Sequence, residues 1–255
     1  MRNSDAKWIE AVRSDPLYQN GVPSISEFRQ NHWHDPTKYG IASRAFGDGF
    51  PKMIQYIVLG LRVSWSEYCS SPFHSLWHSA IWAIAINDEE WLDYAIKHAD
   101  NPNARHGPHP PYYAEINKLF FAVLDKKEIS IESASKIANR KSLPSSAAVV
   151  AKFLFALITN DSQLAIESLS IHLMSCRKIL FIDPAYKMYN VMTHGLYELA
   201  RDQYPKLVVE WDVNKGMPWD KELFAWRRAG HKATSVFDSF TETDRSFLKM
   251  RTPSK

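Results

Sequence analysis

The sequence predicts an all-α protein, built as an array of stacked antiparallel helical hairpins that resembles αα repeats. Runs of Ala, Leu and Ile recur at three- and four-residue spacing, β-branched alternation is scarce, and only 9 of the 255 residues are glycine. A turn also repeats: Ala83–Glu89 returns as Ala156–Ser162, and the turn residues Asp88, Asp125 and Asp161 are 37 and 36 positions apart. Periods of about 20 to 50 residues are typical of stacked helical arrays.

The turns predict how each hairpin is made. In each copy an apolar helical run stops at Asn or Leu, and an Asp follows. An Asp side chain at this point accepts hydrogen bonds from the free amide groups at the start of the next helix. We therefore expect Asp88, Asp125 and Asp161 to cap the second helix of their hairpins.

Three regions follow from the distribution of proline and glycine. Residues 1–51 are predicted to form an N-terminal helical and loop region, and residues 52–205 the helical-hairpin array. Residues 206–255 form an irregular C-terminal segment, which we expect to pack on the array as part of a single domain.

The spacing of apolar residues predicts each helix, and prolines and glycines predict where the helices begin and end. Pro36 and the glycines that follow it end the N-terminal pattern, four prolines exclude a helix from residues 100–111, and Pro184 starts the last helix of the array. The expected helices cover residues 5–13, 24–33, 52–64, 73–86, 91–99, 113–124, 131–139, 146–159, 164–175, 185–204 and 221–228.

Composition restricts the function. The chain is 45% hydrophobic and carries a net charge of +3, too little for a nucleic-acid partner. The longest apolar run, 147–158, is interrupted by Lys152 and is shorter than the roughly 20 residues that span a bilayer, so no membrane partner is expected. The N-terminus lacks the apolar core of a secretory signal. Cys69 and Cys176 belong to no CxxC pattern, which suits a reducing cytoplasm.

Histidines give one possible chemical site. His74 and His78 are four residues apart on an expected helix, so their rings lie on one side. The HExxH glutamate is missing between them, and a metal would need a further ligand such as His32, His34 or Asp35. The simpler interpretation is that these histidines pack at the helix surface and bond to backbone carbonyls.

Catalytic motifs are otherwise missing from the sequence. It contains no GxSxG elbow and no phosphate-binding glycine loop followed by lysine. We therefore predict a protein that is not an enzyme and needs no cofactor.

Nine tryptophans are the other unusual feature. Trp77, Trp82 and Trp91 are expected to fill the core of the first hairpin. The C-terminal segment combines aromatic, acidic and arginine side chains, and our candidate partner-binding residues are Trp211, Asp212, Trp219, Asp220, Trp226, Arg227 and Arg228. This composition is typical of a protein-binding hot spot and equally of a lid that closes the end of a helical array.

Two segments carry a family resemblance. Met192–Ala200 ends in an "ALA"-like helix terminus, and Met217–Leu223 has a Pro followed by an acidic-apolar helix start, with Met before the Pro where the family pattern has Leu. With the preceding helices and Asp turns, the chain resembles the all-helical immunity protein family 49 of bacterial polymorphic toxin and type VI secretion systems.

The resemblance implies a function. It implies a cytoplasmic antitoxin that binds a cognate secreted toxin and blocks it, with no catalytic residues of its own. Two alternatives stay open: a histidine-dependent metalloenzyme using the four histidines named above, and a general helical-repeat adaptor.

Overall fold

Every regular element that the structure describes is a helix, so the predicted all-α class is confirmed. The structure, a computed structural model, describes residues 10, 11, 14, 40, 44, 50–64, 76–99, 112–175, 189–206 and 217–233. The expected helix at 24–33, most of the one at 5–13 and the proline-rich loop at 100–111 lie outside these residues.

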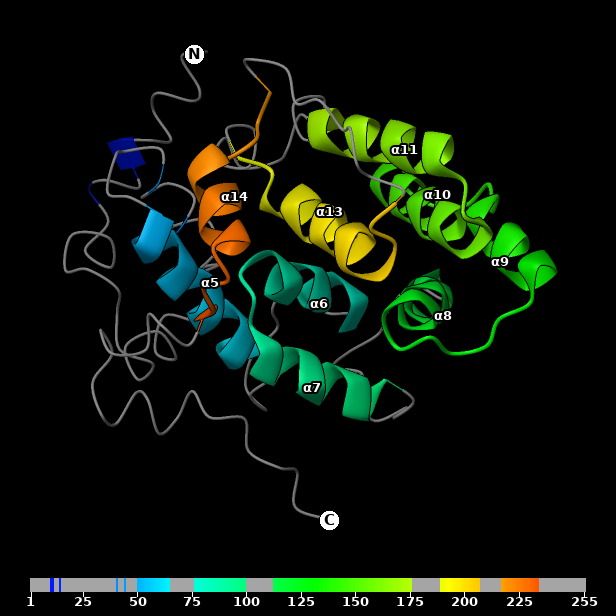
Figure 1. The fold of residues 1–255 in the computed structure, drawn as a ribbon, viewed down its shortest axis with the longest axis horizontal. Coiled ribbons are helices and arrows are strands. Elements are labelled where there is room, and N and C mark those ends of the chain that lie inside the picture. Colours follow the sequence, from blue (N-terminus) through cyan, green and yellow to red (C-terminus); the bar gives the residue numbers. More distant parts are fainter. Residues whose placement is uncertain are drawn as a thin grey trace.

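The helices follow the expected order closely. They are α5 (Phe50–Ser64), α6 (Leu76–Ala85), α7 (Glu89–His98), α8 (Tyr112–Leu124), α9 (Ile131–Ala138), α10 (Ser145–Thr159), α11 (Ser162–Ser175), α13 (Val191–Gln203) and α14 (Lys221–Arg228). Figure 1 shows the hairpins α6/α7, α8/α9 and α10/α11 with α13 and α14 beside them. None of the described helices is long and apolar enough to cross a bilayer.

Two of the three repeated turns have the predicted structure. Asn87 and Asn160 both take the left-handed conformation with φ of 55°, which ends the preceding helix. The Asp88 side chain then accepts a hydrogen bond from the Trp91 amide, and Asp161 Oδ1 accepts one from the Leu164 amide at 3.0 Å. The same Asn-Asp pair therefore ends one helix and begins the next in both hairpins.

The middle turn corrects one prediction, because Asp125 does not cap a helix. α8 ends at Leu124, Lys126 takes the left-handed conformation with φ of 52°, and the chain continues to Ser130 before α9 starts. Ser130 Oγ accepts the hydrogen bond from the Ser133 amide at 3.2 Å. A cap must directly precede its helix, and Asp125 lies five residues before Ser130.

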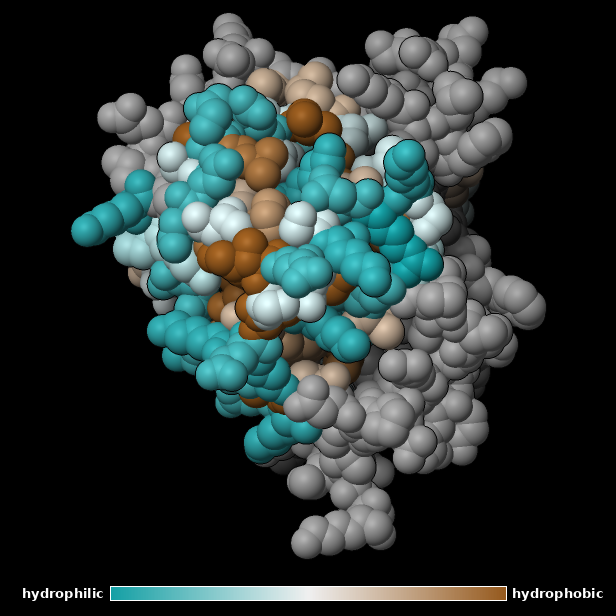
Figure 2. Space-filling view, turned by 90° about the vertical axis from the view of Figure 1, so that its right-hand side faces the viewer, coloured by the Kyte–Doolittle hydropathy of each residue, from teal (hydrophilic) through white to brown (hydrophobic). Residues whose placement is uncertain are grey.

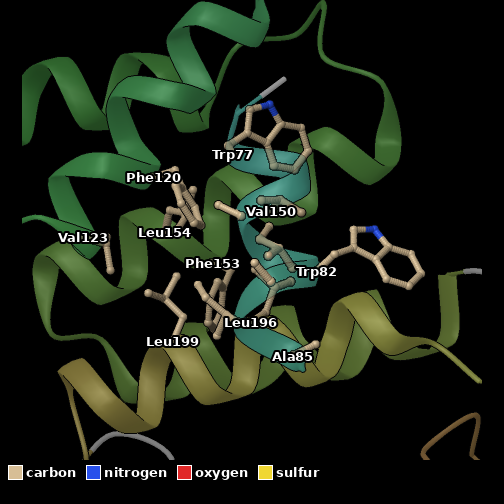
Figure 3. Close-up of a cluster of buried hydrophobic side chains, with 14 of the residues drawn as sticks. Trp77, Trp82, Ala85, Phe120, Val123, Val150, Phe153, Leu154, Leu196 and Leu199 are labelled. Atoms are coloured by element: carbon tan, nitrogen blue, oxygen red, sulfur yellow. The ribbon is translucent and has the colours of Figure 1, made fainter. Parts of the chain in front are cut away.

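α6 runs through the centre of the described structure. All its residues except His78 are buried, as expected of a helix that is apolar on every side. Figure 3 shows Val150, Phe153 and Leu154 of α10 with Leu196 and Leu199 of α13 gathered around it. The predicted core tryptophans are confirmed, since Trp77, Trp82 and Trp91 are at most 5% exposed.

The start of α13 corrects a second prediction. We expected a helix from residue 185, but Tyr189 and Asn190 are not helical and the helix begins at Val191. Asn190 is its N-cap: the Asn190 side chain accepts a hydrogen bond from the Thr193 amide and donates one to the His172 carbonyl at 2.8 Å. Because Asn190 holds α11 and α13 together in this geometry, the helix starts after it.

Backbone hydrogen bonds attach the segment that contains α14 to the hairpins. The Asn190 amide donates to the Pro218 carbonyl at 2.8 Å, and the Ala233 amide donates to the Asn87 carbonyl at 3.2 Å. In Figure 1, α14 lies beside α13 at the side of the molecule away from α9. Residues 217–233, which include several of the candidate binding residues, are therefore held against α13 and the first hairpin.

Candidate functional site

Four rings from α13, α14 and the turn before α14 form the candidate site, which we call the aromatic cluster: His194, Tyr197, Trp219 and Phe224. The Trp219 ring stacks on His194 with centroids 3.5 Å apart and an angle of 14° between the planes. The Tyr197 ring meets Trp219 edge-on at 5.8 Å and Phe224 edge-on at 5.7 Å, and Trp219 lies 5.6 Å from Phe224. The three longer distances are those of favourable aromatic pairs.

Local backbone structure places each ring. His194 and Tyr197 are three residues apart on α13, so they share one side of that helix. Trp219 is held in a tight turn, because its amide donates to the Met217 carbonyl at 2.8 Å. Phe224 follows in the first turn of α14. Trp219, Tyr197 and Phe224 remain partly exposed while His194 is buried beneath them.

Asp220 anchors the base of the cluster. The Asp220 carboxylate is buried, and its Oδ1 accepts hydrogen bonds from the amides of Glu222 and Leu223, which caps α14. Arg44 donates to the same carboxylate from Nε at 2.7 Å and Nη2 at 3.1 Å. The hydrogen bond to Asp220 raises the pKa of the Arg44 guanidinium. Asp220 therefore joins the N-terminal part of the chain to α14.

His194 and His172 are buried as neutral rings. His194 Nε2 accepts a hydrogen bond from the Asp220 amide at 3.1 Å, so the proton of the neutral ring is on Nδ1. Burial lowers the pKa of His194 to about 3 and that of His172 to about 4. His172 Nδ1 lies 2.8 Å from the Thr193 hydroxyl oxygen. Both histidines hold α13 against its neighbours.

The remaining predicted binding residues of α14 lie on different sides of the helix. Arg227 is largely internal: its Nε donates to the Ile84 carbonyl at the end of α6, and burial lowers its pKa. Trp226 packs partly buried on the core and stacks on His231. Arg228 is exposed, and its guanidinium carbon lies 5.8 Å from the centre of the Phe224 ring.

The structure thus brings two of the predicted binding residues, Trp219 and Arg228, to one partly exposed surface. Asp220 and Arg227 lie near it but are engaged in internal bonds, and Trp226 lies on another side of α14. Trp211 and Asp212 lie outside the described residues.

Several residues of this site were not predicted from the sequence. Tyr197 and His194 are in the segment that carries the family resemblance, yet nothing in their spacing pointed to the C-terminal tryptophans. Arg44 is 176 residues from Asp220, and no local pattern marks such a pair.

The proposed histidine metal site is only partly covered by the described residues. His78 is half-buried on α6, where the Trp77 ring meets its imidazole edge-on at 5.3 Å. His32, His34, Asp35 and His74 are outside the described residues. Among the residues that are described, no three His, Cys, Asp or Glu side chains are grouped to hold a metal ion.

Comparison of the chain with protein-family models, with curated proteins and with solved structures finds no match.

Proposed function

We propose that this protein is a non-enzymatic helical binding protein that neutralises a cognate secreted bacterial toxin in the cytoplasm. The observation that carries the proposal is the surface formed by Tyr197, Trp219, Phe224 and Arg228, which we call the binding face. Three aromatic side chains and one arginine meet there, and each is at least partly exposed.

The composition of the binding face favours contact with another protein. Tryptophan, tyrosine and arginine are the residues most enriched among those that dominate protein–protein affinity. Aromatic rings add large contact area, and the tyrosine and tryptophan polar atoms can also reach a partner.

The support beneath the binding face favours the same conclusion. Trp219 is fixed by its stacking on buried His194, and the backbone that carries it is held by the Asp220–Arg44 ion pair. A side chain that is already ordered loses less conformational entropy when a partner binds. The polar groups closest to the face, Asp220 and His194, are engaged in hydrogen bonds that hold α13 and α14.

That the partner is a toxin follows from the family resemblance. The two segments that carry this resemblance each contribute a residue to the binding face. Met192–Ala200 contributes Tyr197, and Met217–Leu223 contributes Trp219. The two segments that suggested an immunity protein therefore supply two of the four residues of the surface proposed to hold the toxin, and Phe224 and Arg228 follow the second segment on α14.

Growth of a heterologous bacterium tests the proposal. Each open reading frame beside the gene for this protein is expressed with and without it, and the protein is then purified from any rescued strain. We expect one neighbour to be toxic, to be tolerated when this protein is present, and to co-purify with it.

The opposite result would overturn the proposal: no toxic neighbour and no co-purifying protein. Metal content of protein purified without a histidine tag would then test the metalloenzyme alternative. Binding of many unrelated peptides with similar affinity would instead favour a general adaptor.

A further inference from the structure

One side of α14 presents a row of exposed residues toward solvent. Lys221, Phe224, Ala225 and Arg228 follow the i, i+3, i+4, i+7 spacing that places residues on one side of a helix. Lys221, Ala225 and Arg228 are exposed and Phe224 is half-buried, whereas Leu223 on another side is buried in the core. We call these four residues the outer row of α14.

Both ends of the outer row are positively charged and lack a carboxylate partner within the described part of the chain. Other cations nearby are paired: Arg44 with Asp220 and Glu222, Arg201 with Glu198 and Asp202, Arg227 with Asp202, and Lys232 with Glu89. Among the described residues, no such pair involves Lys221 or Arg228. The two acidic residues beside Lys221 in sequence, Asp220 and Glu222, both pair with Arg44.

Arg228 is placed so that it remains available to a partner. Its guanidinium carbon lies over the Phe224 ring, 5.8 Å from the ring centre, at the distance of a cation–π contact. The donor N–H groups lie in the plane of the guanidinium and so can still bind a carboxylate through two parallel hydrogen bonds. Phe224 in turn contacts Trp219 and Tyr197, so the outer row continues into the binding face.

We propose that the outer row of α14 binds an acidic segment of the partner protein, and this inference rests on the proposed function. Lys221 and Arg228 are seven residues apart on a helix, which separates their Cα atoms by roughly 10 Å along the axis. The matching segment presents two carboxylates at about that spacing, with an apolar side chain between them on Phe224 and Ala225. Such complementarity speeds association and rejects basic partners.

Two synthetic helical peptides provide the probe. The first carries two glutamates seven residues apart with leucines at the intervening i+3 and i+4 positions, and the second has glutamines in place of the glutamates. In isothermal titration calorimetry at low salt, wild-type protein should bind the glutamate peptide about tenfold more tightly than the glutamine peptide. This ratio corresponds to about 1.4 kcal/mol of binding free energy. The difference should shrink as salt is added.

The variant Lys221→Gln/Arg228→Gln should lose this preference. The matched control is Lys141→Gln/Lys152→Gln, which removes two charges from exposed positions before and on α10 and should retain the preference. Circular dichroism should show the same helical signal for both variants. Equal binding of the two peptides by wild-type protein, or no binding of either, would overturn the inference, as would an unchanged preference in the Lys221→Gln/Arg228→Gln variant.

The growth experiment separates this inference from the proposed function. If the double glutamine variant still rescues cells and binds the toxin with wild-type affinity, the acidic-segment inference is wrong and the proposed function stands. If wild-type protein rescues no strain, the proposed function fails whatever the peptides show.

Discussion

Gly195 controls how closely α13 packs on α6. A Cβ atom at this position would lie 2.0 Å from the Ile81 carbonyl oxygen and 2.8 Å from the Ile81 carbonyl carbon. Both atoms belong to the backbone of α6, so no side-chain rotation relieves the contact. The glycine therefore allows two helices of the core to touch through their backbones.

Replacing Gly195 by alanine should lower the free energy of unfolding by about 3 kcal/mol or more, because the helices must separate. Urea denaturation of both proteins measures the difference. Gly230→Ala is the control: it has φ of 81° but nothing within 4 Å of an added Cβ. This change should cost only about 1 kcal/mol, from the left-handed backbone. Equal losses in the two variants would show that the α6–α13 contact is not the cause.

His172 and His194 should make stability depend on pH. Burial lowers their pKa values to about 4 and about 3, below the unfolded value of about 6.5, so the unfolded chain binds protons first as the pH falls. Their contribution is therefore complete above about pH 6.5 and is lost as the pH falls toward the folded pKa values. Below about pH 6.5 and above its folded pKa, each histidine should lower the free energy of unfolding by about 1.4 kcal/mol for each pH unit of acidification.

Urea denaturation between pH 7 and pH 4.5 tests the two histidines separately. His194→Gln keeps an acceptor near the position of Nε2, and His172→Asn keeps one near Nδ1. In each variant, unfolding should take up about one proton fewer than in the wild type, so the free energy of unfolding should fall less steeply with decreasing pH. If both variants lose stability with pH as steeply as the wild type, other groups cause the acid sensitivity.

At the scale of elements, the repeated Asn-Asp turns have the same backbone but different surroundings. Asn160 is exposed, and no side-chain hydrogen bond of Asn160 is found in the described structure. Asn87 is 8% exposed, and its Nδ2 donates to the His231 carbonyl at 2.9 Å. The first turn thus also holds the chain that follows α14.

Replacing each asparagine by glycine separates the two roles. Glycine adopts the left-handed conformation without strain, so Asn160→Gly should change the free energy of unfolding by less than about 1 kcal/mol. Asn87→Gly also removes the bond to His231 and should cost about 1 to 2 kcal/mol more. Thermal or urea denaturation of the pair gives the comparison, and similar effects at both positions would contradict the assigned role of Asn87.

Local patterns explain which elements could be predicted. Helices α5 to α11 and α14 follow from apolar spacing, and the left-handed Asn with its capping Asp marks two turns. The sequence failed where a distant contact decides the structure. Asn190 starts α13 because it bonds to the His172 carbonyl. Asp125 was predicted to be a cap because it matches the spacing of Asp88 and Asp161, whereas Ser130 directly precedes α9 and caps it.

The candidate site was predictable only in part for the same reason. Residue type pointed to Trp219 and Arg228. The partners that support them, His194 on α13 and Arg44 near the N-terminus, come from parts of the chain that no sequence spacing connects to α14.

At the scale of the whole molecule, Arg44 and Asp220 join the two ends of the described structure. The Asp220 side chain is 0% exposed and that of Arg44 is 14% exposed. Arg44→Met leaves a buried carboxylate without its cation, so the free energy of unfolding should fall by about 3 kcal/mol. Arg140→Met is the control, because its pair with Glu115 is about one-third exposed and should contribute at most about 1 kcal/mol.

A double-mutant cycle with Asp220→Asn isolates this pair in urea denaturation. Arg44→Met should cost much less in the Asp220→Asn background, because the buried charge is already absent. An equal cost in both backgrounds would show that Arg44 stabilises the fold through other contacts, such as its position over the Tyr189 ring.

Figure 2 shows a surface away from the binding face, on the side of the molecule where α9 lies. Hydrophilic side chains predominate among its described residues, with smaller hydrophobic areas between them. Ile131 on α9 and Ile171 on α11 are 62% and 56% exposed. This side offers a comparison for any measurement that locates a partner.

Hydrogen–deuterium exchange of the protein with and without its rescued partner tests the central claim most directly. We predict slower exchange in residues 219–230 and in the part of α13 around Tyr197, with no change in α9. Protection confined to α9 or α11, with residues 219–230 unchanged, would contradict the claim that α13 and α14 form the binding surface.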